Sequence, residues 1–199
     1  MCSADRCGAR FSRTVRAGLG ALMLLAAAGS QAATATEAKP IDRRIAITID
    51  DLPWQTLDGN AWYATDTGAA TMAKHHAQLM AGLRAEKAPV VGFVNENKLV
   101  AEGRVQGVRL HMLRDWLDAG ADLGNHTYGH VDLNAVGLDA FEGDILRGEV
   151  VLRPLLEEKG KTPQWFRHPY LRAGRTPEDK AALQAFLAEH GYRIAPVTH

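Results

Sequence analysis

Residues 121–130, ADLGNHTYGH, run a short apolar segment directly into two histidines that lie four residues apart. An amphipathic helical pattern at 106–119 precedes this segment, and another at 138–159 follows it. A short apolar run between two helical patterns predicts a buried β-strand. His126 and His130 are therefore predicted at the carboxyl end of a strand, inside a strand–helix unit.

The same alternation continues in both directions along the chain. Helical spacing is also present at about 64–87, and a further helix is predicted from its N-cap Thr176 to Gly191. Pro154 predicts a kink or a break within 138–159. Four other short apolar runs predict strands: 45–50 (IAITID), 89–94 (PVVGFV), 163–169 (PQWFRHP) and 192–197 (YRIAPV). Alternating strands and helices indicate an α/β fold with about five parallel strands and right-handed crossovers.

The first 32 residues have the pattern of a secretory signal peptide. Four arginines precede an apolar run at 17–28, and small residues follow up to Ala32. The run is too short to span a bilayer, and we expect cleavage near Ala32. Cleavage would remove Cys2 and Cys7, which are the two cysteines of the chain, and leave neither a disulfide nor a thiolate ligand. Residues 33–43, ATATEAKPIDR, are small and polar and predict a linker.

The balance of charged residues limits which partners the chain is expected to bind. The chain has 23 basic and 23 acidic side chains; without the four arginines and one aspartate of residues 1–32, 19 and 22 remain, a formal charge of −3. This balance gives no reason to expect binding to nucleic acid, or to a membrane after cleavage. The remaining length suits one domain, which we place at 44–199. The sequence leaves the oligomeric state open.

Polar side chains gather at the predicted strand ends. Asp50 and Asp51 end the first strand, His126 and His130 follow the third, and Arg167 ends the fourth. The carboxyl ends of the strands form the catalytic face of a β/α barrel, so these residues are expected to converge. Two imidazoles and one carboxylate with open positions are typical of a catalytic zinc site. A second carboxylate could then take a proton from water, and a nearby guanidinium would hold that carboxylate ionised.

Each of these groups also has an ordinary structural alternative. Adjacent aspartates often cap a turn, a histidine pair can be two polar loop residues, Arg167 can form a surface ion pair, and Tyr170 can be a core aromatic. Their shared position at one edge of the sheet favours the functional interpretation. His75 and His76 point about 100° apart on the predicted helix, and we assign both to its solvated face.

Three motifs, in this order, resemble those of the polysaccharide deacetylase family, which is also known by NodB homology and as a carbohydrate esterase family. They are ITIDDLPW (47–54), GNHTYGH (124–130) and WFRHPYL (165–171), and the resemblance covers about 44–197. The resemblance implies an irregular (β/α) barrel. It also implies a divalent metal, with zinc expected and cobalt or nickel as alternatives.

The resemblance implies a role for each site residue. Asp50 matches the general base of the family, and Arg167 matches the arginine that pairs with that base. The backbone N–H at Tyr170 matches the group that helps to hold the oxyanion. Three residues match the metal ligands: Asp51, His126 and His130.

The end of the chain departs from the family pattern. Members continue after the fifth strand with an Asp and Trp motif and a histidine that protonates the leaving amine, and neither follows here. A closed barrel takes about 250 residues. We therefore expect a C-terminally incomplete domain, with an incomplete (β/α) barrel and an exposed edge at 192–197. No residue is assigned as general acid, and return of the proton by Asp50 is the fallback.

These features predict a metal-dependent hydrolase that removes N-acetyl groups from an exported or cell-wall polysaccharide or oligosaccharide. The predicted location is periplasmic or extracellular. One alternative is a catalytically impaired remnant that retains metal and glycan binding. Another keeps the fold but acts on a small cyclic amide or a phosphoester, because fold alone does not fix chemistry.

Overall fold

Five strands form one parallel sheet. The computed structural model describes residues 45–54 and 65–197, so the predicted signal peptide (1–32) and linker (33–43) lie outside the described residues. The sheet has the order β1-β2-β5-β6-β7, and every neighbouring pair is parallel. The strands are β1 (Ile47–Leu52), β2 (Val90–Val94), β5 (Asp122–Asn125), β6 (Trp165–Phe166) and β7 (Arg193–Ile194). The prediction of about five parallel strands is confirmed.

The strand order follows the order of the chain. Each crossover therefore steps to the next position in the same direction, whereas a doubly wound sheet reverses direction at a switch point. Winding in one direction is the topology of a (β/α) barrel. Among the described strands β1 and β7 are the two edges, so this sheet is open. The expected α/β fold of an incomplete barrel is confirmed.

Helices fill the crossovers largely where helical spacing predicted them. The long ones are α1 (Asp66–Glu86), α2 (Gly107–Asp118), α4 (Leu138–Arg147) and α6 (Pro177–Glu189). Five short elements of the described chain were not predicted: a hairpin of β3 (Val100–Ala101) with β4 (Arg104–Val105), the 3₁₀ helices η2 (Glu96–Leu99) and η3 (Pro169–Leu171), and α3 (Leu133–Val136). In the described part of the chain no helix combines the length and apolarity needed to cross a membrane.

The predicted break within 138–159 is present, but it lies before Pro154. Helix α4 ends with Gly148 as its C-cap, and α5 (Leu152–Glu157) begins four residues later. Pro154 occupies the first turn of α5, where a backbone N–H has no partner within the helix in any case. The proline is therefore compatible with the helix that contains it.

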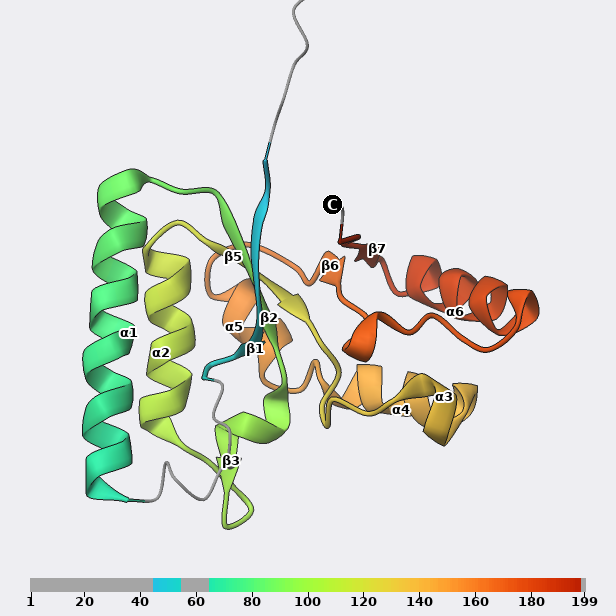
Figure 1. Ribbon diagram of the computed structural model, residues 1–199, viewed down its shortest axis with the longest axis horizontal. Coiled ribbons are helices and arrows are strands. Elements are labelled where there is room, and N and C mark those ends of the chain that lie inside the picture. Colours follow the sequence, from blue (N-terminus) through green and yellow to red (C-terminus); the bar gives the residue numbers. More distant parts are fainter. Residues whose placement is uncertain (1–44, 55–64, 198–199) are drawn as a thin grey trace, which may run out of the picture. The chain divides into compact units, whose positions relative to one another are not determined.

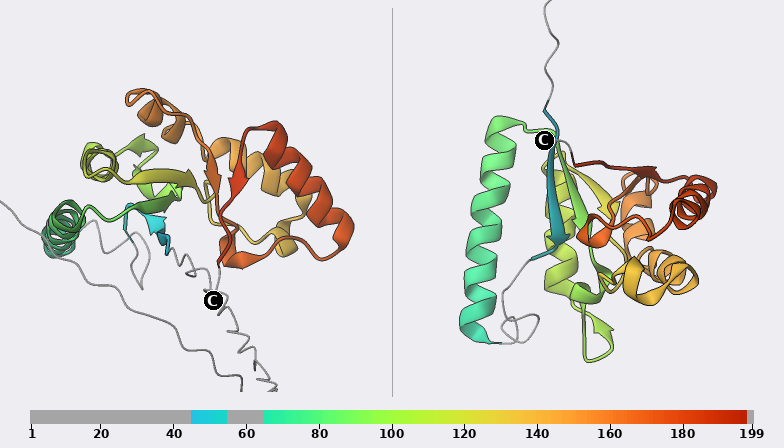
Figure 2. Two further views of the ribbon diagram at one scale, coloured as in Figure 1. Left: turned by 90° about the horizontal axis from the view of Figure 1, so that it is seen from above. Right: turned by 45° about the vertical axis from the view of Figure 1, so that its right-hand side comes forward.

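Two clusters of buried side chains fix the sheet. Figure 1 shows α1 and α2 side by side on one flank, near β1, β2 and β5, with α3, α4 and α6 gathered near β6 and β7. The two views of Figure 2 keep the same grouping. The first cluster includes Trp116 and Leu123, and the second includes Phe141, Phe166 and Leu187. Each such side chain contributes about 1.5–3 kcal/mol on burial, so the strand ends have rigid support.

One histidine of α1 differs from the sequence-based assignment. His75 is exposed, as predicted, but His76 is only 6% exposed. Its Nε2 atom lies 2.9 Å from Oδ2 of Asp115, which is on α2. The assignment of His76 to a solvated face was wrong, because its partner comes from a helix 39 positions away.

Candidate metal centre and active site

Asp50 and Asp51 lie in a β-bulge near the end of β1. The register between β1 and β2 slips at this point, so the two aspartates oppose Phe93 alone. Asp51 has a φ of 69°, in the left-handed region that residues other than glycine rarely adopt. A bulge re-aims side chains that would otherwise alternate between the two faces of the sheet. Asp50 and Asp51 both act electrostatically on His126, which places both carboxylates near the same imidazole.

The two histidines lie on the turn that follows β5. Thr127 and His130 have φ values of 65° and 53°, so the turn uses the left-handed region twice without a glycine at either position. The Thr127 hydroxyl accepts the backbone N–H of His130 at 3.0 Å. The rings of His126 and His130 meet edge to face with their centroids 4.8 Å apart. The turn therefore brings both imidazoles to the same side.

Three of the predicted residues form one cluster of possible ligand atoms. Asp51, His126 and His130 each offer one atom, and these atoms all lie within 4.8 Å of one another. The Nε2 atom of His130 is 3.7 Å from Oδ1 of Asp51. Within residues 45–54 and 65–197 no other group of three His, Cys, Asp or Glu side chains meets this geometry.

The His126 ring is oriented by the backbone of the third motif. Its Nδ1 lies 2.8 Å from the carbonyl oxygen of Arg167, and the side chain is almost fully buried. Because a carbonyl only accepts, Nδ1 carries the proton and Nε2 keeps a free lone pair. Burial lowers the pKa of His126, which favours the neutral ring. Metal-binding histidines commonly have this second hydrogen bond.

Arg167 lies beneath the site but does not pair with Asp50 in this structure. Its Nη2 donates to the Thr48 hydroxyl at 2.9 Å, and its guanidinium lies 4.9 Å from the centre of the Phe93 ring. Nε of Arg167 and Oδ1 of Asp50 are both buried without a hydrogen-bond partner. Thr48 lies two positions before Asp50 on β1, so Arg167 contacts the strand that carries the predicted base. The pairing of Arg167 with Asp50 therefore stays a prediction.

Tyr170 lies at the rim of the cluster. It is 58% exposed, and its ring meets the His130 ring at a centroid distance of 4.6 Å. Tyr170 and Leu171 have φ values of 55° and 57°. Consecutive residues in this disfavoured region are held there by their surroundings, and such strain is concentrated at functional sites.

Two residues after β2 complete the surroundings of the cluster. Lys98 Nζ lies 3.2 Å from Oδ1 of Asp51 and donates to the Asp51 carbonyl oxygen at 3.1 Å. Asn95 is fully buried and donates from Nδ2 to the carbonyl oxygens of His126 and Thr127. Neither the contacts of Asn95 nor those of Lys98 were predicted from the sequence.

Comparison with known proteins was made by sequence family and by structure. A sequence model of the family described as polysaccharide deacetylase matches residues 37–194. No curated protein matches the chain.

Three solved structures with a similar fold illustrate the structural likeness. A family 4 carbohydrate esterase from Streptomyces lividans, in complex with acetate, has a TM-score of 0.53 and 20% identity over 77% of this chain and 62% of its own. The chitin deacetylase of the fungal pathogen Colletotrichum lindemuthianum has a TM-score of 0.52 and 25% identity over 75% and 53%. BA3943, a CE4 family pseudoenzyme from Bacillus anthracis, has a TM-score of 0.51 and 12% identity over 77% and 43%.

The matches cover a larger share of this chain than of the solved structures. The chain spans less than two thirds of the length of each of these three structures, whereas the family match covers most of the chain itself. The three motifs that carry the site, at 47–54, 124–130 and 165–171, all fall inside the matched residues. This chain is a member of the polysaccharide deacetylase family.

Proposed function

We propose that this protein is a metal-dependent hydrolase that removes N-acetyl groups from an exported or cell-wall polysaccharide or oligosaccharide. The observation that carries the proposal is the cluster of Asp51, His126 and His130, whose ligand atoms lie within 4.8 Å of one another. The structures of a chitin deacetylase and of an acetate-bound carbohydrate esterase share the fold, which supports an N-acetylated glycan as the substrate class.

The chemistry of the donor set fits a divalent metal. Two imidazole nitrogens and one carboxylate oxygen, with further positions left open, match the preference of catalytic zinc, and cobalt or nickel would accept the same donors. Burial lowers the pKa of His126 and so favours the neutral ring, which is the ligating form of an imidazole. A cation held there would polarise the acetamide carbonyl and lower the pKa of water.

The residues around the cluster supply the proton transfer and the orientation. Asp50, beside His126 and with a buried oxygen that has no hydrogen-bond partner, accepts a proton from the attacking water. The water oxygen bonds to the carbonyl carbon, the carbon–nitrogen bond breaks, and Asp50 returns the proton it accepted to the sugar nitrogen. The backbone N–H of Tyr170 donates to the oxygen that gains negative charge. The products are acetate and a free amine.

Arg167 acts on the base in this proposal. A guanidinium close to a carboxylate favours its ionised form and so keeps it able to accept a proton. Arg167 already contacts Thr48, which is two positions before Asp50 on β1. Nε of Arg167 is a buried donor without a hydrogen-bond partner and Oδ1 of Asp50 is a buried acceptor without one, which supports a pairing of the two.

Export is part of the proposal. The charged, apolar and small-residue segments of residues 1–32 have the order of a signal peptide. An exported enzyme would meet glycans of the periplasm or of the cell surface. This step is tested by comparing the size of the chain in whole cells with its size in the periplasm or medium. An uncleaved chain retained in the cytoplasm would contradict export.

The direct test of the function is release of acetate from chitooligosaccharides. The chain is stripped with a chelator, and acetate is measured before and after addition of zinc or cobalt. We expect release only after metal is restored. Release that is equal with and without metal would contradict metal dependence, and no release under any condition would contradict the hydrolase.

A glycan-binding protein without turnover is the second candidate. A family pseudoenzyme has a similar fold, and in this structure Arg167 donates to Thr48 while Oδ1 of Asp50 has no hydrogen-bond partner. Calorimetry with metal and with chitooligosaccharide separates the two: binding of both without acetate release would favour this candidate over the enzyme.

A further inference from the structure

We propose that Asn125, Tyr192 and Gly148 are positioning residues of the metal centre, which fix the turn that carries the two histidines. The inference rests on the proposed function, since it takes His126 and His130 as metal ligands. Two observations support the inference: the hydrogen bonds of Asn125 and the close approach of Gly148 to the turn. They involve different elements but the same turn.

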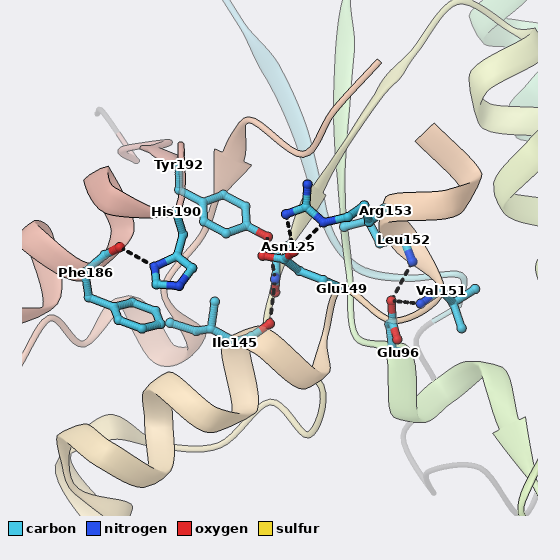
Figure 3. Close-up of polar contacts among 10 residues, drawn as sticks. All are labelled: Glu96, Asn125, Ile145, Glu149, Val151, Leu152, Arg153, Phe186, His190 and Tyr192. Atoms are coloured by element: carbon cyan, nitrogen blue, oxygen red, sulfur yellow. Dashed lines mark hydrogen bonds and ion pairs between the residues drawn. The ribbon is translucent and has the colours of Figure 1, made fainter. Parts of the chain in front are cut away.

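Asn125 ties the turn to two distant parts of the fold. The residue is fully buried at the end of β5. Its Oδ1 accepts the backbone N–H of Thr127 at 2.7 Å. Its Nδ2 donates at 2.9 Å to the carbonyl oxygen of Ile145 on α4 and at 2.9 Å to the hydroxyl of Tyr192 (Figure 3). Thr127 has a left-handed φ of 65°, so this amide holds the disfavoured turn immediately after His126.

Tyr192 fixes which way the amide of Asn125 points, together with the carbonyl oxygen of Ile145. The tyrosine hydroxyl donates to Oε1 of Glu149 at 2.7 Å, and Arg153 binds the other oxygen of the same carboxylate. Because its own hydrogen is committed to Glu149, the hydroxyl can only accept from Asn125. Nδ2 of Asn125 must then face Tyr192, and Oδ1 is left for Thr127. Figure 3 shows Asn125, Glu149 and Tyr192 meeting at this point.

Gly148 supports the turn by direct contact. A Cβ atom on this residue would lie 2.9 Å from the carbonyl carbon of Thr127, 2.9 Å from the backbone nitrogen of Tyr128 and 3.0 Å from Oδ1 of Asn125. The φ of Gly148 is −73°, which any residue can adopt, so the small size of glycine is what the position requires. The end of α4 therefore lies directly against the backbone between His126 and His130.

Glycine variants of α4 provide a matched test. Gly148→Ala adds one methyl group against the turn, whereas Gly143→Ala adds the same group to the same helix where no atom lies within 4 Å. Tyr192→Phe removes only the hydroxyl. Leu187→Val is its packing control, because Leu187 belongs to the same buried cluster as Tyr192 but has no polar link to the turn. Zinc affinity is measured by calorimetry, and the geometry of the site by the visible absorption of the cobalt-loaded full chain.

We expect Gly148→Ala and Tyr192→Phe to weaken zinc binding by about tenfold or more and to change the cobalt spectrum. Gly143→Ala and Leu187→Val should keep the zinc affinity and the cobalt spectrum of the unaltered chain, even where Leu187→Val lowers the melting temperature. Equal affinity and equal spectra for Gly148→Ala and Gly143→Ala would overturn the inference. If Gly148→Ala does not fold, an unaltered affinity and spectrum in folded Tyr192→Phe would overturn it instead. Absence of metal binding by the unaltered chain would overturn the proposed function, whereas normal binding with no effect of the variants would overturn this inference alone.

Discussion

The Nδ1 atom of His126 lies 2.8 Å from the carbonyl oxygen of Arg167. This contact joins the second motif to the third through a backbone atom, so it does not depend on the arginine side chain. It fixes the ring and leaves Nε2 for a ligand. The same kind of contact occurs at His190, whose Nδ1 lies 2.8 Å from the carbonyl oxygen of Phe186 at the end of α6 (Figure 3).

The two histidines allow a matched test of the metal site. His126→Ala should reduce zinc content from about one ion per chain to near zero, because a catalytic site has only three protein ligands. His190→Ala removes an imidazole with a similar backbone contact outside the cluster and should leave the zinc content unchanged. Elemental analysis of the purified chains gives both values. Full zinc content in His126→Ala would remove this residue from the ligand set.

Glu96 makes stability depend on pH. Burial raises its pKa from 4.5 to about 7, although its Oε1 accepts the backbone N–H groups of Val151 and Leu152. A raised carboxyl pKa means that the folded state binds the proton more tightly than the unfolded state. Protonated Glu96 therefore contributes roughly 3 kcal/mol to the free energy of unfolding. This contribution is present in full below pH 4.5 and is lost as the pH rises through about 7.

Glu96→Gln isolates this effect, because glutamine keeps an oxygen for the two N–H groups and does not titrate. The free energy of unfolding is measured with urea at pH 5 and at pH 8. Between pH 5 and pH 8, the free energy of unfolding of Glu96→Gln should rise by about 2–3 kcal/mol relative to that of the unaltered chain. A difference that stays constant with pH would contradict the raised pKa.

The bulge at the aspartates depends on a close contact across the sheet. A Cβ at Gly92 on β2 would lie 2.2 Å from Cδ1 of Leu52, the residue that follows Asp51. Gly92→Ala should therefore displace Leu52 and lower the free energy of unfolding by about 1–3 kcal/mol. Gly82→Ala in α1 meets no atom within 4 Å and should be neutral or stabilising by about 0.5–1 kcal/mol. Urea unfolding of both variants checks this, and equal effects would contradict the packing argument.

The parts of the fold with a regular period could be predicted from the sequence. The strands around 47–52, 90–94 and 122–125 are apolar runs bounded by turn residues, and the Thr176 cap begins α6 as expected. Because parallel strands end at one edge, the meeting of Asp51 with the two histidines also followed from local patterns.

The details of the site depend on contacts between distant residues. The left-handed conformations of Asp51 and Thr127 occur at residues that disfavour them, and no local pattern signals such a conformation. Lys98 reaches Asp51 across 47 positions, from a short 3₁₀ helix that has no periodic signal. The burial of His76 against Asp115 has the same cause, since the partner lies on another helix.

The central claim is that Asp50 takes the proton of the attacking water while Asp51 binds the metal. The most direct measurement is acetate release from chitooligosaccharides by the zinc- or cobalt-loaded chain, with Asp50→Asn compared with the unaltered protein and with zinc content measured on the same samples. We predict a loss of roughly 10²–10⁴-fold in rate with zinc content unchanged, because only proton transfer is removed. Equal acetate release by the two chains would contradict the assignment of Asp50 as the base.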